Sequence, residues 1–225
     1  MRSLGNIKRV AHKLSEYYKD FGHHNKKNPL NELLYIICSL KTRENRYSNS
    51  YYKLKKLCPK FEDLEKMKIE DFQAILHESG LSNQKAKNIK VILESIKAQF
   101  GKITLSPLKK YSEKECEAFL TSLPGVGLKT ARCVMLMALK HKVYPVDTHC
   151  WRIANRLEWI KSKKTFQNCR VHEMNSLQNI IPKNLRYSLH VNFVSLGREF
   201  CLALNPKCKE CPIQDDCPSM NIKTT

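Results

Sequence analysis

Apolar residues recur every three or four positions along most of the chain. The clearest runs cover residues 30–37, 69–76, 86–96 and 185–200. This period places apolar side chains on one face of a helix, whereas the alternation of apolar and polar residues that is typical of a half-buried strand is nearly absent. Most glycines and prolines fall between these runs, where they end helices. The pattern predicts an almost all-α fold of many helices with short connections.

The first 21 residues follow the same pattern and carry Glu16 and Asp20 among basic residues. They are predicted to form an amphipathic helix, because transit peptides are poor in acidic residues. The sequence also lacks an apolar run as long as a membrane-spanning helix, and it lacks a lipidation signal. We therefore expect no cleavage, no export and no membrane partner.

One interhelical connection is unusual. Leu123-Pro124-Gly125-Val126-Gly127 follows a helical stretch that ends near Ser122, and the next helix is predicted to begin near Leu128. The two glycines allow a tight turn and a close approach to another group, while the N-H groups at the start of the next helix point outward. This hairpin can bind a phosphate group. An ordinary interhelical turn explains the same residues, and the motif alone does not decide between a phosphate-binding hairpin and such a turn.

Lys129 lies in the first turn predicted after that hairpin. The positive end of a helix and partial burial both lower the pKa of an ammonium group, which makes a neutral, nucleophilic amine more accessible. The hairpin therefore comes with a candidate nucleophile.

Asp147 directly precedes another apolar helical pattern that starts with Trp151 and Ile153. Its position predicts a helix N-cap, whose carboxylate accepts hydrogen bonds from the first helical N-H groups. A capping aspartate can still face a cleft, so a catalytic role stays open. The nearby His149 is interpreted as a packed, hydrogen-bonded structural histidine, because the spacing supplies it with no catalytic partner.

Composition and charge narrow the class of protein. The chain has 225 residues, 42% of them hydrophobic, which suffices for one large domain or two small ones with a buried core. Forty Lys and Arg against 21 Asp and Glu give a formal net charge of +19. Such a charge favours a polyanionic partner, first of all nucleic acid, although a merely solubilising basic surface is the alternative.

The last part of the sequence contains four closely spaced cysteines. They are Cys201, Cys208, Cys211 and Cys217, in a C-x6-C-x2-C-x5-C arrangement. Four thiolates suit either zinc or an iron-sulfur cluster, and ligand type alone does not choose between them. Disulfides are disfavoured, because the other six cysteines are scattered through apolar or helical contexts and are most simply small buried hydrophobic residues.

Four motifs in this order resemble the endonuclease III family of base-excision DNA glycosylases. They are LPGVGLKTA at 123–131, VDTHCWRIANR at 146–156, LGREFC at 196–201 and the terminal cysteines, with further matches at 80–89 and 32–42. The resemblance implies a two-lobed helix-hairpin-helix fold. One lobe would be a six-helix, barrel-like domain over 27–140 that contains the hairpin. The other would combine 1–26 with 141–225 and hold a [4Fe-4S] cluster on the four cysteines.

The resemblance also implies a function. Lys129 stands at the position of the nucleophilic lysine of bifunctional members, and Asp147 at that of the catalytic carboxylate. We expect a monomeric DNA glycosylase with AP lyase activity that removes damaged bases, by default oxidised pyrimidines, in base-excision repair. Its partner would be double-stranded DNA that contains a damaged base or an abasic site, and the base must leave the helical stack to be reached.

The residues that would read DNA are partly atypical. The hairpin residues Gly125, Val126 and Gly127 are expected to contact the DNA backbone. The family's Ser-x-Gln-Thr motif, whose glutamine fills the gap left by the extruded base, reads Ser39-Leu40-Lys41-Thr42, and a lysine donates hydrogen bonds but cannot accept them. Leu81 matches an apolar wedge of the family, with a core leucine as the alternative. Basic residues that could contact phosphates are Arg43, Arg46, Lys85, Lys87, Lys207 and Lys209. For the first four of them, an ordinary solvated face is the alternative.

The default function, carried out in the cytoplasm by a nucleoid-associated protein, has two alternatives, of which the Lys41 change permits the first. One is a family member with a shifted substrate, such as an oxidised purine or a deaminated or mismatched base. The other is a non-catalytic iron-sulfur protein that binds DNA through the hairpin alone.

Overall fold

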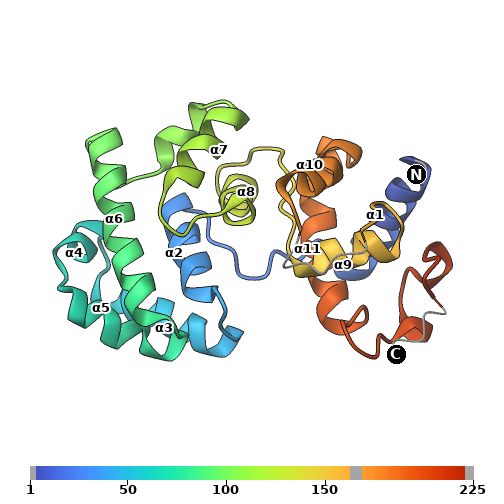
Figure 1. Cartoon of the computed structure of the whole chain (residues 1–225), viewed down its shortest axis with the longest axis horizontal. Coiled ribbons are helices and arrows are strands. Elements are labelled where there is room, and N and C mark those ends of the chain that lie inside the picture. Colours follow the sequence, from blue (N-terminus) through green and yellow to red (C-terminus); the bar gives the residue numbers. More distant parts are fainter. Residues whose placement is uncertain (1–3, 163–168, 221–225) are drawn as a thin grey trace. The chain divides into compact units, whose positions relative to one another are not determined.

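The computed structural model describes residues 4–162 and 169–220, and all regular structure within these ranges is helical (Figure 1). The all-α prediction is confirmed. Contacts between Cα atoms divide the chain into two compact units, one formed by residues 25–141 and the other by residues 1–24 together with 142–225. Each unit has its own set of helices and is described by itself.

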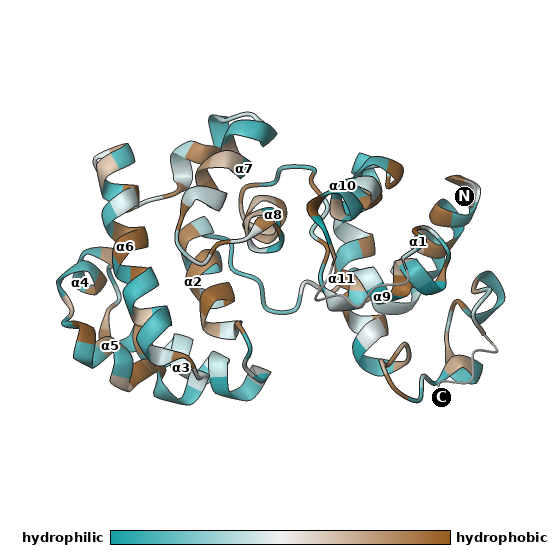
Figure 2. Ribbon diagram, in the orientation of Figure 1, coloured by the Kyte–Doolittle hydropathy of each residue, from teal (hydrophilic) through white to brown (hydrophobic). Residues whose placement is uncertain are grey.

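The unit of residues 25–141 contains seven α-helices and two short 3-10 helices. These are α2 (Pro29–Ser39), α3 (Glu44–Leu57), α4 (Phe61–Lys66), α5 (Ile69–Leu76), η1 (His77–Ser79), α6 (Ser82–Phe100), η2 (Ser106–Lys110), α7 (Glu113–Ser122) and α8 (Leu128–Met137). Helix α2 is central, because it packs against α3, α6 and α8 and is buried along most of its length. Figure 2 shows the apolar residues of this helix in brown. Asn28 caps α2 by accepting hydrogen bonds from the backbone N-H groups of Leu30 and Asn31, each at 3.0 Å.

The described residues of the discontinuous unit contain four α-helices and three short 3-10 helices. These are α1 (Leu4–Tyr18), α9 (Thr148–Arg156), α10 (Val171–Ile180), η4 (Lys183–Leu185), α11 (Arg186–Glu199), η5 (Cys208–Glu210) and η6 (Gln214–Asp216). Helix α11 packs against both α1 and α9. The amphipathic helix predicted for the first 21 residues is confirmed over the described part.

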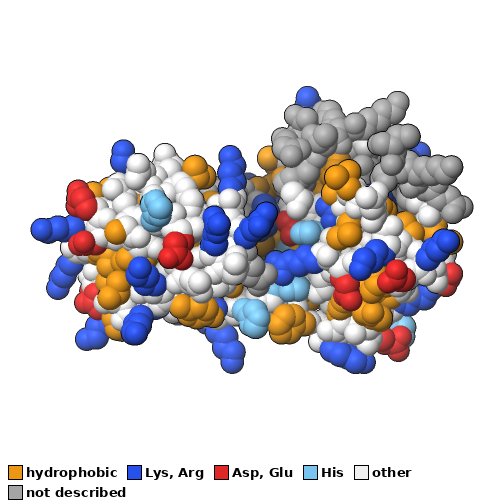
Figure 3. All heavy atoms as spheres, turned by 90° about the horizontal axis from the view of Figure 1, so that it is seen from below, with side chains coloured by type: hydrophobic (Ala, Val, Ile, Leu, Met, Phe, Trp, Pro, Cys, Tyr) orange, Lys and Arg blue, Asp and Glu red, His pale blue; other side chains and the backbone are white. Residues whose placement is uncertain are grey.

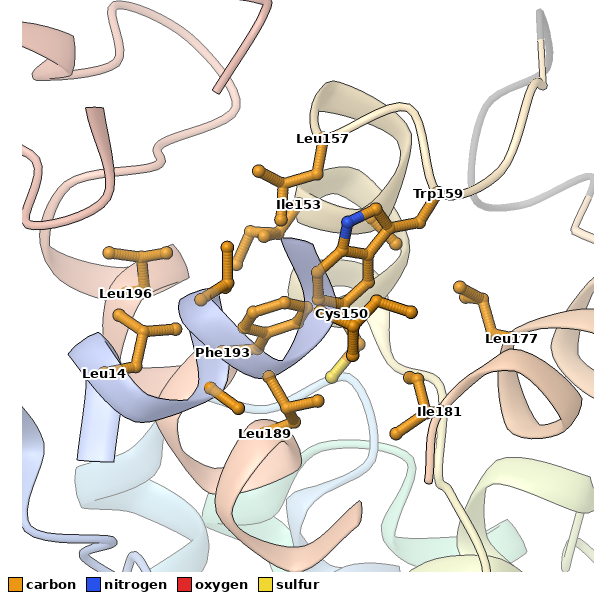
Figure 4. Close-up of a cluster of buried hydrophobic side chains, with 14 of the residues drawn as sticks. Leu14, Cys150, Ile153, Leu157, Trp159, Leu177, Ile181, Leu189, Phe193 and Leu196 are labelled. Carbon is orange, nitrogen blue, oxygen red and sulfur yellow. The ribbon is translucent and has the colours of Figure 1, made fainter. Parts of the chain in front are cut away.

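The core of this unit gathers side chains from all four α-helices (Figure 4). Leu14 of α1, Leu177 of α10 and Phe193 of α11 are fully buried. Burying a side chain of this size stabilises a fold by roughly 1.5–3 kcal/mol. Trp159 packs beside Phe193, with ring centroids 5.4 Å apart, and donates its indole N-H to Asn6 Oδ1 at 2.8 Å. The core therefore joins residues from both ends of the chain.

A buried carboxylate adds a second link between α1 and the cysteine-rich end. Asp216 is 4% exposed and lies 2.6 Å from Arg9 Nε and 2.8 Å from Lys13 Nζ. Both cations lie on α1. Because a buried carboxylate needs charged or hydrogen-bonding partners, the two cations hold the loop that carries Cys217.

The outer surface carries most of the charge of the protein. Lysine and arginine side chains are spread over the face shown in Figure 3. In the part of the chain that the structure describes, no helix has both the length and the apolar character to cross a membrane.

Candidate functional site

The predicted hairpin between α7 and α8 is confirmed. Helix α7 ends at Ser122, α8 begins at Leu128, and the Val126 N-H closes the turn on Leu123 O at 3.1 Å. Val126 is 4% exposed and anchors the turn, while the glycines on either side are exposed. Gly127 is the N-cap of α8 and offers no capping side chain. The first N-H groups of α8 thus lack a side-chain cap, as a site for an anion requires.

The two hairpin glycines serve different purposes. Gly125 has a φ of +76°, and a Cβ there would clash with Asn88 Nδ2 of α6. Gly127 has a φ of −83°, and a Cβ there would meet no atom within 4 Å. Gly125 is therefore required by the fold, whereas Gly127 leaves open space beside the start of α8.

Lys129 is the second residue of α8 and is half-buried. The carboxylate of Glu32 on α2 lies within electrostatic range of it and is itself fully buried. Glu32 accepts hydrogen bonds from Asn25 Nδ2 at 2.5 Å and from the Lys26 N-H at 2.6 Å. Burial raises the pKa of Glu32, while these two hydrogen bonds and the charges of Lys129 and Lys26 oppose the rise. The candidate nucleophile thus has an acidic neighbour.

The sequence interpretation missed the role of Glu32. The signal was present, because this glutamate interrupts the apolar run 30–38, and a carboxylate inside such a run needs partners. Its partners on the preceding loop were not identified from the sequence.

Asp147 is the N-cap of α9, as predicted. Its Oδ1 accepts a hydrogen bond from the Cys150 N-H at 2.8 Å, and the side chain is half-buried. His149 has the structural role expected of it, since its Nδ1 lies 3.1 Å from Arg152 Nη2 and its ring packs on α11 where Gly197 leaves room. Burial lowers the pKa of His149, although the charge of Asp147 opposes that effect.

Two candidate DNA-reading residues share an unusual backbone conformation. Lys41 and Leu81 are exposed, and their φ angles of +53° and +51° lie in the left-handed region. Leu81 is 56% exposed, so the alternative of a core leucine is wrong. A left-handed conformation is disfavoured for residues with a Cβ atom, so the surrounding structure must hold both residues in place.

The prediction that Lys85 contacts phosphate is contradicted. Lys85 is 3% exposed, and its Nζ donates to Ser79 O at 2.6 Å, to Cys38 O at 2.7 Å and to Thr42 Oγ1 at 3.1 Å. Its ammonium group is therefore held inside the protein. The other basic residues of that prediction, Arg43, Arg46, Lys87, Lys207 and Lys209, are exposed, and Arg43 and Arg46 line an open pocket with Lys41.

The four terminal cysteines line one cavity. Apolar residues of α9 and α11 also line this cavity. All ten cysteines of the chain are free, and five of the other six are buried. Burial, followed by the neighbouring sulfurs, raises the pKa of Cys211 to about 11. The sulfurs are thus neighbours around a shared space.

Among the described residues, no three His, Cys, Asp or Glu side chains come together as a group that could hold a metal ion. Four thiolates suit either a zinc ion or an iron-sulfur cluster, so the four cysteines that line the cavity do not choose between the two.

The comparisons with known proteins agree with the fold and the motifs. Residues 34–177 match the family model of the HhH-GPD superfamily base excision DNA repair protein. The chain is 30% identical over 194 residues to endonuclease III of Thermotoga maritima, and the match covers 86% of this chain and 84% of that protein. It is also 30% identical over 151 residues to the DNA glycosylase/AP lyase ROS1 of Arabidopsis thaliana, which covers 61% of this chain but only 11% of that much longer protein.

The fold is likewise similar to solved structures. The structure of a trapped endonuclease III-DNA covalent intermediate superposes with a TM-score of 0.81 and 24% identity, and the match covers 98% of each chain. At that identity the superposition shows a common fold. Together with the family match and the bacterial relative, it shows that the chain belongs to the HhH-GPD superfamily of base excision DNA repair proteins, as an endonuclease III-like DNA glycosylase.

Proposed function

We propose that this chain is a bifunctional DNA glycosylase and AP lyase that removes damaged bases, by default oxidised pyrimidines, from duplex DNA. The observation that carries the proposal is the place of Lys129, which is half-buried in the first turn of α8 directly after the hairpin. A lysine there combines a helix N-terminus that attracts phosphate with an amine close to the bound backbone.

Asp147 acts in base removal. As the bond between C1′ and the base nitrogen breaks, its electron pair leaves with the base and positive charge develops on the sugar. An ionised carboxylate stabilises that charge most strongly where water is scarce. One oxygen of Asp147 is already held by the Cys150 N-H, which fixes the orientation of the carboxylate.

Lys129 acts in strand cleavage. Its neutral amine attacks C1′ and loses a proton, and opening of the sugar ring at O4′ leaves a protonated Schiff base. The iminium acidifies the C2′ proton, whose removal expels the 3′ phosphate as the bond between C3′ and oxygen breaks. Glu32 is the buried acidic neighbour of this side chain, and its charge attracts the ammonium form of Lys129 before the amine is deprotonated for attack.

DNA binding uses the hairpin backbone and the positive charge of the chain. The net charge of +19 attracts duplex DNA and makes binding steeply dependent on salt. Lys41 and Leu81 are the exposed side chains that enter the duplex where the damaged nucleotide has left the stack.

A [4Fe-4S] cluster on Cys201, Cys208, Cys211 and Cys217 is the cofactor that we propose. The proposal is supported by the cavity that the four cysteines share and by the donor set, since four cysteine thiolates are the usual ligands of such a cluster. Bound there, the cluster would supply rigidity and an electron-transfer centre, and the excision chemistry above requires neither a metal nor an electron. Cys211→Ser should yield colourless protein, whereas Cys169→Ser, outside the cavity, should remain yellow-brown.

The decisive experiment is a panel of duplexes, each with one defined lesion, incubated with the protein and borohydride. Borohydride reduces the Schiff base to a stable amine, so a covalent adduct identifies both the substrate and the type of nucleophile. Lys129→Ala should abolish the adduct while much of the DNA binding remains. Lys114→Ala, an exposed lysine on α7, is the matched control and should form the adduct as the unchanged protein does.

Other outcomes would select among the alternatives. An alkali-labile product without an adduct would indicate a glycosylase that lacks lyase activity. An adduct only with purine lesions, deaminated bases or mismatches would indicate a shifted substrate, the second candidate that Lys41 favours because it replaces an amide with a cation. DNA binding without any product would indicate the non-catalytic alternative.

A further inference from the structure

Lys85 joins two separate loops of the unit of residues 25–141. Its ammonium group has three protons, and it donates to three oxygens: Cys38 O at the end of α2, Ser79 O at the end of η1, and Thr42 Oγ1. The hydroxyl of Thr42 also donates to Ser79 O. These contacts fasten the loop after α2 to the loop before α6.

Each fastened loop carries one exposed residue in the left-handed conformation. Lys41 directly precedes Thr42, and Leu81 follows Ser79 by two residues. Neither residue has the conformational freedom of glycine, so both conformations persist only because the surrounding contacts fix the backbone. The contacts of Lys85 reach both loops, and the hydrogen bond from Thr42 to Ser79 O also joins them.

The burial of this lysine argues for a role in positioning. A buried ammonium is costly to desolvate, and an apolar residue in its place would often stabilise a fold as well or better. The three partners of Lys85 are neutral oxygens. Burial lowers the pKa of Lys85, while the nearby Cys38 thiol opposes this. The desolvation cost indicates that the three hydrogen bonds of Lys85 serve to fix the geometry of the two loops.

We propose that Lys85 is a positioning residue that holds Lys41 and Leu81 together for recognition of the gap in the duplex, without touching DNA itself. The inference rests on the proposed function, in which those two side chains enter the duplex. Two side chains on separate loops can enter the same gap in the duplex only if the distance between the loops is fixed. The hydrogen bonds of Lys85 fix that distance.

The test compares Lys85→Met with Lys87→Met in binding to two duplexes. One duplex carries a tetrahydrofuran abasic-site analogue, which cannot be cleaved, and the other is undamaged. Lys85→Met should lower the preference for the abasic duplex about tenfold and leave the salt dependence of binding to the undamaged duplex unchanged. Lys87→Met removes an exposed charge on the same helix, so it should weaken binding to both duplexes alike and reduce the salt slope.

Two further variants test the role of Lys85 even if Lys85→Met does not fold. Thr42→Val retains the shape of the side chain but removes the hydroxyl that receives the Lys85 hydrogen bond, and it should reduce the preference in the same direction. Leu81→Ala removes one of the two side chains directly. Because Lys85 acts through Leu81 and Lys41, the double variant Lys85→Met/Leu81→Ala should lose less than the sum of the two single losses.

The outcomes separate this inference from the proposed function. If the unchanged protein does not prefer the abasic duplex, both are overturned. If it does prefer that duplex and if folded Lys85→Met and Thr42→Val retain the preference, only the role of Lys85 is overturned. A reduced salt slope in Lys85→Met would also overturn it, since that result means direct contact with phosphate.

Discussion

Arg156 Nη1 donates a hydrogen bond to Cys201 Sγ across 3.1 Å. The same guanidinium group donates to Leu202 O at 2.7 Å and to Ala203 O at 3.3 Å, so it holds both the sulfur and the chain that follows it. A positively charged donor to a sulfur stabilises negative charge on that sulfur.

The first prediction concerns this arginine. Hydrogen bonds to ligand sulfurs help to set the reduction potential of an iron-sulfur cluster. With the proposed cluster bound, Arg156→Met should lower the potential and accelerate the loss of visible absorbance in air, and Arg156→Lys should have a smaller effect. Electrochemistry on the DNA-free protein measures the first quantity. Identical potentials and decay rates in all three proteins would contradict the expectation.

Asp147 offers a way to separate capping from catalysis. Asparagine caps a helix as well as aspartate does, so Asp147→Asn should leave the thermal midpoint nearly unchanged while base release slows by about 100-fold or more. Asp147→Ala removes the hydrogen bond to Cys150 as well and should cost about 1 kcal/mol of stability. Single-turnover excision and thermal unfolding measure the two effects. An unchanged rate in Asp147→Asn would remove the carboxylate from the mechanism.

The hairpin glycines should respond differently to alanine. Gly125→Ala places a Cβ against Asn88 and forces a side chain into a positive φ, which should destabilise the protein by about 1–2 kcal/mol from the backbone conformation alone. Adding Asn88→Ala should recover only the part due to the clash. Gly127→Ala meets open space, so it should cost only the smaller penalty of an alanine at the N-cap, but it should weaken DNA binding if the backbone approaches a phosphate there. Equal stability losses at both glycines would contradict the structural distinction.

His149 should make stability depend on pH. Arginine only donates hydrogen bonds, so Nδ1 of His149 accepts from Arg152, and protonation would remove this acceptor. Burial holds the pKa of His149 below its ordinary value of 6.5, so the unfolded chain binds the extra proton more readily. Stability due to this histidine is therefore present above pH 6.5 and is lost as pH falls through the lowered pKa.

Substitution of His149 tests whether stability falls at low pH because of this residue. His149→Asn keeps an acceptor near the position of Nδ1 but cannot be protonated. The fall in thermal midpoint between pH 7 and pH 5 should be smaller in His149→Asn than in the unchanged protein. His24, which is exposed, supplies the control substitution His24→Asn and should leave the fall unchanged.

Local features of the structure were predictable from the sequence. The helices follow from the apolar period, the hairpin from two closely spaced glycines, and the cap at Asp147 from its place before an apolar pattern. Each of these depends on residues within a few positions of one another. The shared cavity of the four cysteines is also largely local, since short loops confine them near the end of α11.

Buried charges were not predictable in the same way. Lysine is a residue type that usually lies at the surface, and the partners of Lys85, Cys38 and Thr42, lie more than 40 positions away in the sequence. Whether such a lysine faces solvent or the interior depends on how α2 packs against α6, which the apolar period does not specify. The burial of Glu32 was not predictable either, because its neighbour Lys129 lies on a helix that is far away in the sequence.

The discontinuous unit has a consequence for the newborn polypeptide. Helix α1 leaves the ribosome well before α11, against which its apolar face must pack. Synthesis proceeds at roughly 5–20 residues per second, so α11 is completed on the order of ten seconds or more after α1. During that time the apolar side chains of Val10 and Leu14 have no helix to pack against, while residues 25–141 can already fold. Translation speed and the chaperones that shield such side chains should therefore govern the yield of this protein in the cell.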